Sequence, residues 1–368
     1  MANVVGIRSY DYVEFYVGSA KTVAYWFAKA LGMNISAYKG PETSHRERCS
    51  YLLESQNLKI VVTGALQPQS SEINSFLSLH GDGIKRWSVV VDHVEKAFDY
   101  AVKNGAVPIV RPTKLEDNDG VVYHSAIKLY DDTELVFINR DEYKGVFMPG
   151  FGPALQKIEL SSEDTALKGI DHIVGNVRTN QMDQMADYFN KALDFETFID
   201  FGPGAISTQY SALLSKVVRA KDNVVKNPIN EPYKGKFKSQ IEEFIEQYHG
   251  TGVQHIAIET SDICKTISSL RKNGVEFLEI PDTYYDLMRQ KNPDIKENID
   301  DLQRLGILMD FEGEGYLLQL FTKPIFDRPT FFFEFIQRNG KSEGFGEGNF
   351  QALFESIELD QEKRGNLV

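Results

Sequence analysis

The sequence predicts an α+β protein built from two homologous halves, and three observations support this fold class. The chain has 368 residues, which is enough for two or three domains of ordinary size. Segments near its start recur in its second half. In both halves, stretches of alternating apolar residues flank stretches with apolar residues at helical spacing, a pattern typical of helices packed on a curved mixed sheet.

The first repeat covers residues 9–33 and 169–195. Both segments read as a strand, a short loop and a helix that ends in Lys-Ala-Leu. Asp11 then corresponds to Asp171. From this aspartate to Lys-Ala-Leu, the second segment is two residues longer than the first.

Two further repeats extend the match. Residues 80–106 and 249–275 share His-Gly-x-Gly and Lys-Asn-Gly without a gap, and residues 133–140 match 330–338 at a common Arg. Between the halves, residues 141–168 are rich in Gly, Pro and Ser and read as a connection. We therefore expect domains at 1–150 and 165–368.

Composition and charge exclude several other classes. The chain is 42% hydrophobic, 12% aromatic and 25% charged, as in globular proteins with a sizeable core. A net charge of −13 disfavours nucleic acid as a partner, because an acidic surface repels phosphates. We expect no membrane span and no signal peptide, because charged residues interrupt every apolar stretch. Two cysteines, Cys49 and Cys264, fit a reducing cytoplasm.

Three ionisable residues of the second half have no equivalent in the first. His172 corresponds to Tyr12, His255 to Arg86, and Glu334 to Val136. Each lies in a predicted strand on the face that carries apolar side chains. One buried histidine can be an ordinary core residue, but a carboxylate in the run FFFEF must be neutralised or paired.

Two histidines and one carboxylate on three strands form a recurrent metal-ligand set. Non-haem Fe(II) oxygenases use two histidines and a carboxylate on one face of the ion, which leaves positions open for substrate. Zinc accepts the same donors. From the residues alone, His172, His255 and Glu334 therefore predict a metal site in the second half without fixing the metal.

The same region resembles the 4-hydroxyphenylpyruvate dioxygenase family of the vicinal oxygen chelate superfamily. The matching motifs are IDHIVGNV, PINEP, KSQI, GVQHIA, EFLEIPDTYYDL, LGIL, GYLLQLFTKP, DRPTFFFEFIQR and GFGEGNF, and in the first half EYKGVFMPGF. This resemblance implies two domains of paired βαβββ modules, with one Fe(II) per subunit held by His172, His255 and Glu334 inside an open β-barrel of the C-terminal domain. The N-terminal domain is expected to lack a metal site.

The resemblance also implies a substrate pocket and a reaction. The expected substrate-binding residues are Ser211, Pro228, Asn230, Gln240, Gln254, Gln319, Phe321, Phe332, Asn349 and Phe350. The partners are expected to be 4-hydroxyphenylpyruvate and O2, with homogentisate and CO2 as products of tyrosine and phenylalanine catabolism. Phe321 and Phe350 would sandwich the ring, and Ser211, Asn230 and Gln240 would bind its polar end. The family also implies a homodimer or homotetramer in the cytoplasm.

The C-terminal segment is expected to form a lid. Its apolar residues from Phe350 to Ile357 occupy one helical face, and a glycine-rich run precedes them.

The sequence also allows three other functions. A 4-hydroxymandelate synthase would use the same substrate and metal but hydroxylate the benzylic carbon, and the bulk of Phe321 favours attack on the ring instead. An extradiol ring-cleaving dioxygenase shares the ligand set but takes catechols. A non-catalytic binding module would have no use for the three ligands.

Overall fold

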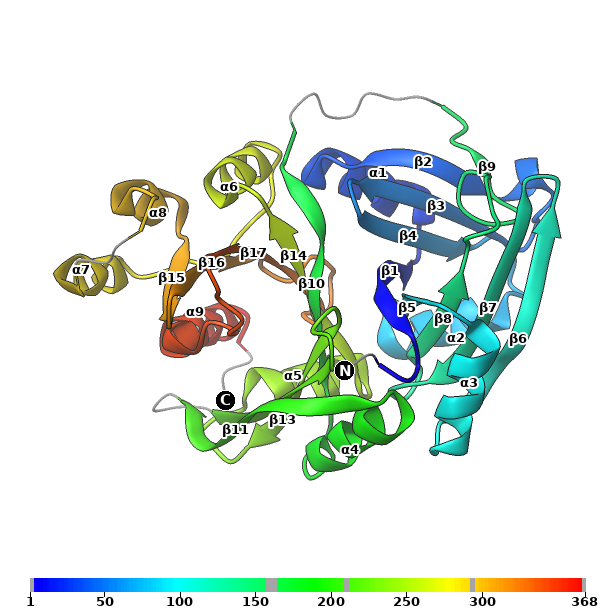
Figure 1. The fold of residues 1–368 in the computed structure, drawn as a ribbon. Helices are drawn as coiled ribbons and strands as arrows, with labels where there is room; N and C mark the ends of the chain where they lie inside the picture. The colour runs from blue at the N-terminus through cyan, green and yellow to red at the C-terminus, as the bar shows by residue number, and fades with distance from the viewer. Residues whose placement is uncertain (1–2, 157–163, 208–211, 292–294, 366–368) are drawn as a thin grey trace.

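The computed structural model confirms the α+β class, with two curled mixed sheets and helices interspersed among the strands (Figure 1). It describes residues 3–156, 164–207, 212–291 and 295–365. The first sheet is formed by residues 7–153 and the second by residues 167–339. The domain boundaries at 150 and 165 stay a prediction.

The first sheet has the strand order β6-β7-β8-β5-β1-β4-β3-β2-β9. Its strands are β1 Ile7–Tyr16, β2 Asn34–Lys39, β3 Arg48–Ser55, β4 Leu58–Ala65, β5 Gly83–Val91, β6 Pro108–Asp117, β7 Gly120–Lys128, β8 Glu134–Asn139 and β9 Gly152–Pro153. The α-helices of this half are α1 Ala20–Leu31, α2 Ser71–His80 and α3 Val94–Lys103.

The second sheet has the strand order β11-β12-β13-β10-β14-β17-β16-β15. Its strands are β10 Leu167–Asn176, β11 Phe195–Ser207, β12 Ala212–Ala220, β13 Lys226–Tyr233, β14 Gly252–Thr260, β15 Leu308–Glu312, β16 Gly315–Phe321 and β17 Phe332–Asn339. The helices are α4 Met182–Ala192, α5 Gln240–Tyr248, α6 Ile263–Lys272, α7 Asp282–Lys291, α8 Ile299–Leu305 and α9 Phe350–Lys363. Figure 1 shows this sheet curling around α9.

Local sequence explains why these elements form. In α4, Met182, Ala186 and Phe189 recur at helical spacing and are buried, so the helix packs one apolar stripe on the sheet. Helix α5 starts at a capping box, in which Ser239 accepts from the backbone N–H of Glu242 and the Glu242 carboxylate accepts from the N–H of Ser239. Strand β14 is buried on both faces apart from Glu259, because one face meets the core and the other a cavity.

Strand pairing reproduces the sequence repeat. At the centre of each sheet, β1 pairs antiparallel with β5, and β10 pairs antiparallel with β14. The next pairs, β5 with β8 and β14 with β17, are parallel. Ser88, two residues after Arg86, pairs with Val136, and Ala257, two residues after His255, pairs with Glu334. The register therefore places Arg86 and Val136 where the second half has His255 and Glu334.

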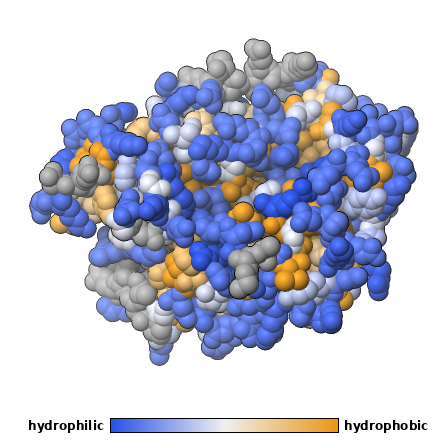
Figure 2. Space-filling view, in the orientation of Figure 1, coloured by the Kyte–Doolittle hydropathy of each residue, from blue (hydrophilic) through white to orange (hydrophobic). Residues whose placement is uncertain are grey.

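The two halves share a hydrophobic core. Phe15 of β1 packs edge-to-face against Phe331, with ring centroids 5.0 Å apart. The surface is mostly hydrophilic on the face drawn in Figure 2, with hydrophobic residues in small patches. Within the described ranges, no helix combines the length and apolarity needed to cross a membrane.

Candidate active site

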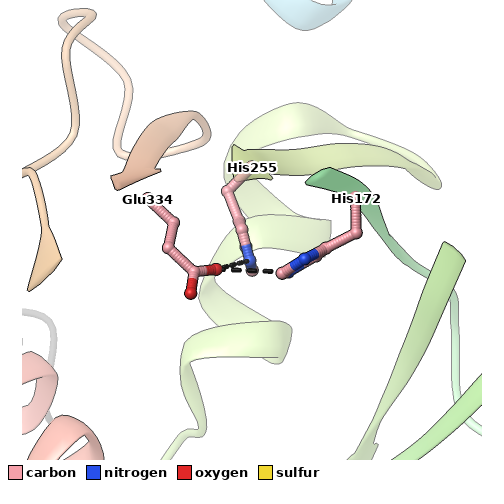
Figure 3. Close-up of side chains that lie close together, drawn as sticks. All are labelled: His172, His255 and Glu334. Carbon is pink, nitrogen blue, oxygen red and sulfur yellow. Dashed lines mark ion pairs between the residues drawn. The ribbon is translucent and has the colours of Figure 1, made fainter. Parts of the chain in front are cut away.

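Three adjacent strands bring His172, His255 and Glu334 together. His172 lies on β10, His255 on β14 and Glu334 on β17. The Nε2 atoms of His172 and His255 lie 3.2 and 3.4 Å from Oε2 of Glu334 (Figure 3). One ligand atom from each residue lies within 4.8 Å of the other two, and no other such group of His, Cys, Asp or Glu occurs among the described residues.

Burial and mutual contact set the charges at this cluster. Burial alone would raise the pKa of Glu334, but the two histidines outweigh it and hold that pKa below its ordinary value. Burial lowers the pKa of His255. For His172 burial also acts downward, but Glu334 and Asp171 together raise its pKa above the ordinary value. A cluster that keeps its carboxylate ionised suits a cation.

The second nitrogen of each histidine is already engaged. Nδ1 of His172 lies 2.7 Å from Oδ1 of Asp171, and Nδ1 of His255 lies 3.1 Å from Oε1 of Gln254. If both Nδ1 atoms donate to these oxygens, both Nε2 atoms are left as acceptors that face Glu334. This donor set, with its orienting partners, fits a divalent transition metal.

A cavity opens beside the three ligands. It holds roughly 600 Å³ of space not filled by protein atoms. Ten of the thirteen predicted site residues line it: His172, His255, Glu334, Pro228, Asn230, Gln240, Gln254, Phe321, Phe332 and Phe350. The apolar face of α9, with Phe350, Leu353, Phe354 and Ile357, forms part of the same wall. The site therefore combines a polar ligand cluster with a largely apolar chamber.

Three predicted residues are not in this wall. Ser211 lies outside the described residues. Gln319 is fully buried, and its amide packs against Gly346, where an added Cβ would lie 2.2 Å from Nε2. Asn349 is fully buried too, and its Oδ1 accepts a hydrogen bond of 2.8 Å from the hydroxyl of Tyr284. The structure thus places both amides behind the wall.

Outside α9, six residues of the cavity wall were not among the site residues predicted from the sequence: Val174, Phe201, Leu213, Ser215, Val217 and Phe345. Ser215 lines the cavity and pairs with Asn230 across β12 and β13. Phe345 also lines it, with its ring 5.0 Å from the ring of His172. The repeat held a signal for Phe345, because it follows Arg338 by the same interval as Phe147 follows Arg140.

Fold and site define a member of the vicinal oxygen chelate class. Residues 169–298 match the family described as Glyoxalase/Bleomycin resistance protein/Dioxygenase superfamily. A 4-hydroxyphenylpyruvate dioxygenase from Tetrahymena thermophila is 44% identical over 98% of this chain and 91% of its own length. The enzyme of that name from Dictyostelium discoideum is 40% identical over 98% of this chain and its whole length. The chain therefore belongs to the 4-hydroxyphenylpyruvate dioxygenase family, and it is a dioxygenase.

Solved structures agree on the fold. A variant of 4-hydroxymandelate synthase from Streptomyces coelicolor superposes with a TM-score of 0.84 at 27% identity, over 97% of this chain and 99% of its own. A fusion protein of a xylose isomerase-like TIM barrel and a 4-hydroxyphenylpyruvate dioxygenase superposes with a TM-score of 0.74 at 20% identity, over 97% of this chain and 53% of its own. The second likeness concerns the fold alone.

Proposed function

We propose that this enzyme converts 4-hydroxyphenylpyruvate and O2 to homogentisate and CO2, with Fe(II) held by His172, His255 and Glu334. One observation carries the proposal: the three ligands converge at one end of an aromatic-lined cavity, in a chain related over nearly its whole length to enzymes of that name. When bound, Fe(II) would supply the redox chemistry that activates O2.

The ring of the substrate would lie among phenylalanines. Phe321 is buried in the cavity wall, and Phe350 faces the same space from α9. Phe332 stacks on His255, with ring centroids 4.7 Å apart and planes 17° from parallel. Aromatic walls favour offset or edge-to-face contacts with a phenol ring, so these side chains would fix where the ring sits relative to the metal ligands.

Polar side chains gather along another part of the wall. Gln254 accepts from Nδ1 of His255, and its Nε2 donates to Oε1 of Gln240 at 3.5 Å. Asn230 donates to Oδ1 of Asn176 at 3.4 Å. Both contacts are long, so Gln240 and Asn230 can turn to a polar group of the substrate. Ser215, beside Asn230, supplies a further hydroxyl.

Helix α9 would exclude water. Its apolar face forms part of the cavity wall, and its C-terminal end is tied to α5 by two contacts of 3.0 and 2.9 Å from Nη2 of Arg364 to Glu243. A dry chamber strengthens polar contacts inside it and prevents unproductive reactions with solvent.

The remaining expectations belong to the same proposal. The enzyme would act in tyrosine and phenylalanine catabolism as a cytoplasmic homodimer or homotetramer. The two unpaired cysteines agree with a reducing compartment.

The test is product analysis by mass spectrometry after incubating the Fe(II)-loaded enzyme with 4-hydroxyphenylpyruvate and O2. Homogentisate as the main product supports the proposal. 4-Hydroxymandelate as the main product would assign the chain to the synthase reaction. No oxidised product, with iron present in stoichiometric amount, would overturn a catalytic role for this site on this substrate.

A further inference from the structure

The first half contains a cavity of its own. It holds roughly 860 Å³ of space not filled by protein atoms, against roughly 600 Å³ beside the metal ligands. Tyr12 and Arg86 line it, and these occupy the repeat positions of His172 and His255. Val136, at the position of Glu334, lies in the apolar cluster that includes Tyr12. The duplication has therefore kept a chamber at the equivalent place and replaced its metal ligands.

The framework around this chamber is the same as around the metal ligands. Arg140 contacts Asp11 with Nη1 and Nη2, each at 2.6 Å, and its guanidinium lies 4.5 Å from the ring centre of Phe147. Phe147 packs edge-to-face on Tyr12 at 5.4 Å, as Phe345 packs on His172. A preserved framework keeps the chamber from collapsing, although His172, His255 and Glu334 have been replaced there by Tyr12, Arg86 and Val136.

Three cations line the chamber, and one of them, Arg86, stands at a ligand position. Lys39, Arg48 and Arg86 line the chamber, with Glu14 as its single lining carboxylate. Glu14 is already committed, because Arg86 lies 3.1 Å from Oε2 and the hydroxyl of Thr63 donates to Oε1. Glu134 and Glu72 also contact Arg86, each at 3.1 Å. Arg86 is therefore neutralised, while Lys39 and Arg48 leave positive charge beside the space.

Lys39 is the cation with least compensation. Within the part of the chain that the structure describes, its Nζ has neither a hydrogen bond nor an ion pair, and the ring of Phe151 lies 5.7 Å away. Burial, and then Arg48, lower its pKa although Glu14 acts in the opposite direction. Among the described residues, the Arg48 side chain makes only long polar contacts, at 3.3 Å to Glu72 and 3.4 Å to the Tyr16 hydroxyl. Both groups would gain from an anion.

Apart from Ser50 and His124, the rest of the wall is apolar and aromatic. Val61, Val122, Ile138 and Phe147 are buried and face the chamber, and Phe151 lines it beside Lys39. A space of this kind binds a ring or a short hydrocarbon, and a cation at its edge selects a negatively charged head group.

We propose that the first-half cavity is a second ligand site, which binds a small aromatic carboxylate. The carboxylate would pair with Lys39 and Arg48, and the ring would pack on Phe147 and Phe151. This site is separate from the metal ligands and needs no metal.

Phenylacetate is a suitable probe, with benzyl alcohol as a ring of similar size that carries no charge. Crystals of the iron-loaded enzyme soaked in phenylacetate should contain the probe in the first-half cavity, with its carboxylate at Lys39. In calorimetric titrations, Lys39→Met should weaken this binding by about tenfold or more, because a charge-assisted contact is lost. Lys341→Met removes the same charge from an exposed position and should leave the affinity unchanged.

Folding is checked by the thermal midpoint, and Arg48→Met provides a second variant if Lys39→Met is unstable. Phenylacetate found only beside His172, His255 and Glu334, or in neither cavity, overturns the proposal. So does equal affinity of Lys39→Met and the unaltered enzyme, or binding of benzyl alcohol as tight as that of phenylacetate.

Discussion

Arg338 holds Asp171 through two parallel contacts, from Nε and from Nη2, each 2.8 Å long. Asp171 is the partner of Nδ1 of His172, so the pair orients a proposed metal ligand. Burial opposes ionisation of Asp171, but Arg338 and His172 hold its pKa well below the ordinary value. Arg140 and Asp11 form the same pair in the first half, which lacks the proposed ligands. The pair therefore belongs to the scaffold, and only in the second half does it orient a proposed metal ligand.

Arg338→Lys is predicted to weaken metal retention. Lysine keeps the charge but cannot make two parallel contacts, so Asp171 and the His172 ring lose their fixed orientation. Loss of such orienting contacts costs about 10- to 100-fold in metal affinity. The measurement is iron content after dialysis against graded chelator.

Arg140→Lys is the matched control, because it breaks the equivalent pair in the first half. It should lower thermal stability and leave iron retention unchanged. Equal iron loss in both variants would mean that the pair acts only through overall stability.

Much of this site could be read from the repeat. The alignment of Arg86 with His255 and of Val136 with Glu334 is confirmed by strand register, because a duplicated fold must keep its pairing to keep its core. The sequence pattern predicts which face of a strand a side chain lies on, but whether that side chain reaches the cavity was harder to predict. Gln319 shares a strand face with Phe321, yet it packs under Gly346 because the backbone of that segment covers it. Such coverage depends on how a distant loop folds back, which alternation does not encode.

Glu334→Gln is predicted to keep the fold and lose most of the iron. The amide is nearly isosteric, but it lacks the charge that the two histidines face at 3.2 and 3.4 Å. Iron per subunit and turnover should fall together. Val136→Ala, at the equivalent position, should lower the free energy of unfolding by about 1–3 kcal/mol and leave the iron content unchanged. Stoichiometric iron and normal turnover in Glu334→Gln would refute the ligand assignment.

Asp131 is predicted to give the contact between the halves a dependence on pH. Its carboxylate accepts from the backbone N–H of Thr251 at 3.0 Å and pairs with Arg178 at 2.7 Å. Burial would raise its pKa, but these contacts outweigh it and hold the pKa below 3.8. A carboxyl group with a depressed folded-state pKa stabilises the fold above the unfolded value, and that contribution is lost as the pH falls through the folded value.

Asp131→Asn should therefore lower the free energy of unfolding by about 1 kcal/mol at neutral pH, a modest figure because the group is partly exposed. Urea unfolding of both proteins, at pH 7 and at about pH 3, measures how the difference changes. The difference in free energy of unfolding between the two proteins should be smaller at the lower pH. A difference that stays constant would show that the charge of Asp131 is not what stabilises the contact.

A chain that ends at Gly348 is predicted to retain iron and lose turnover. All three ligands precede this point, whereas Phe350, Leu353 and Phe354 of the removed helix line the cavity. Without them the chamber opens to water. Iron content and product formation are measured on the same preparation. Full homogentisate production by the shortened enzyme would mean that α9 serves packing alone.

Phe321→Ile is predicted to change which carbon is oxidised. Phe321 pairs with Glu334 across β16 and β17, and its ring lies 6.2 Å from that of His255 and 6.1 Å from that of Phe332. Isoleucine removes ring volume on one side of the substrate, so the substrate ring can tilt and bring its benzylic carbon nearer the metal ligands. A displacement of about 1 Å can change a rate by about 100-fold.

The variant should therefore make less homogentisate and some 4-hydroxymandelate, with iron content unchanged, as measured by mass spectrometry of the products. Phe311→Ile makes the same replacement on β15, where the side chain is 41% exposed and is not part of the cavity wall, and it should leave the product ratio unaltered. If Phe321→Ile yields homogentisate alone at a near-normal rate, Phe321 does not steer the oxidation. The choice between ring and benzylic attack would then lie with other side chains of the wall. Phe350, the first residue of α9, and Phe332, stacked on His255, are the next to replace.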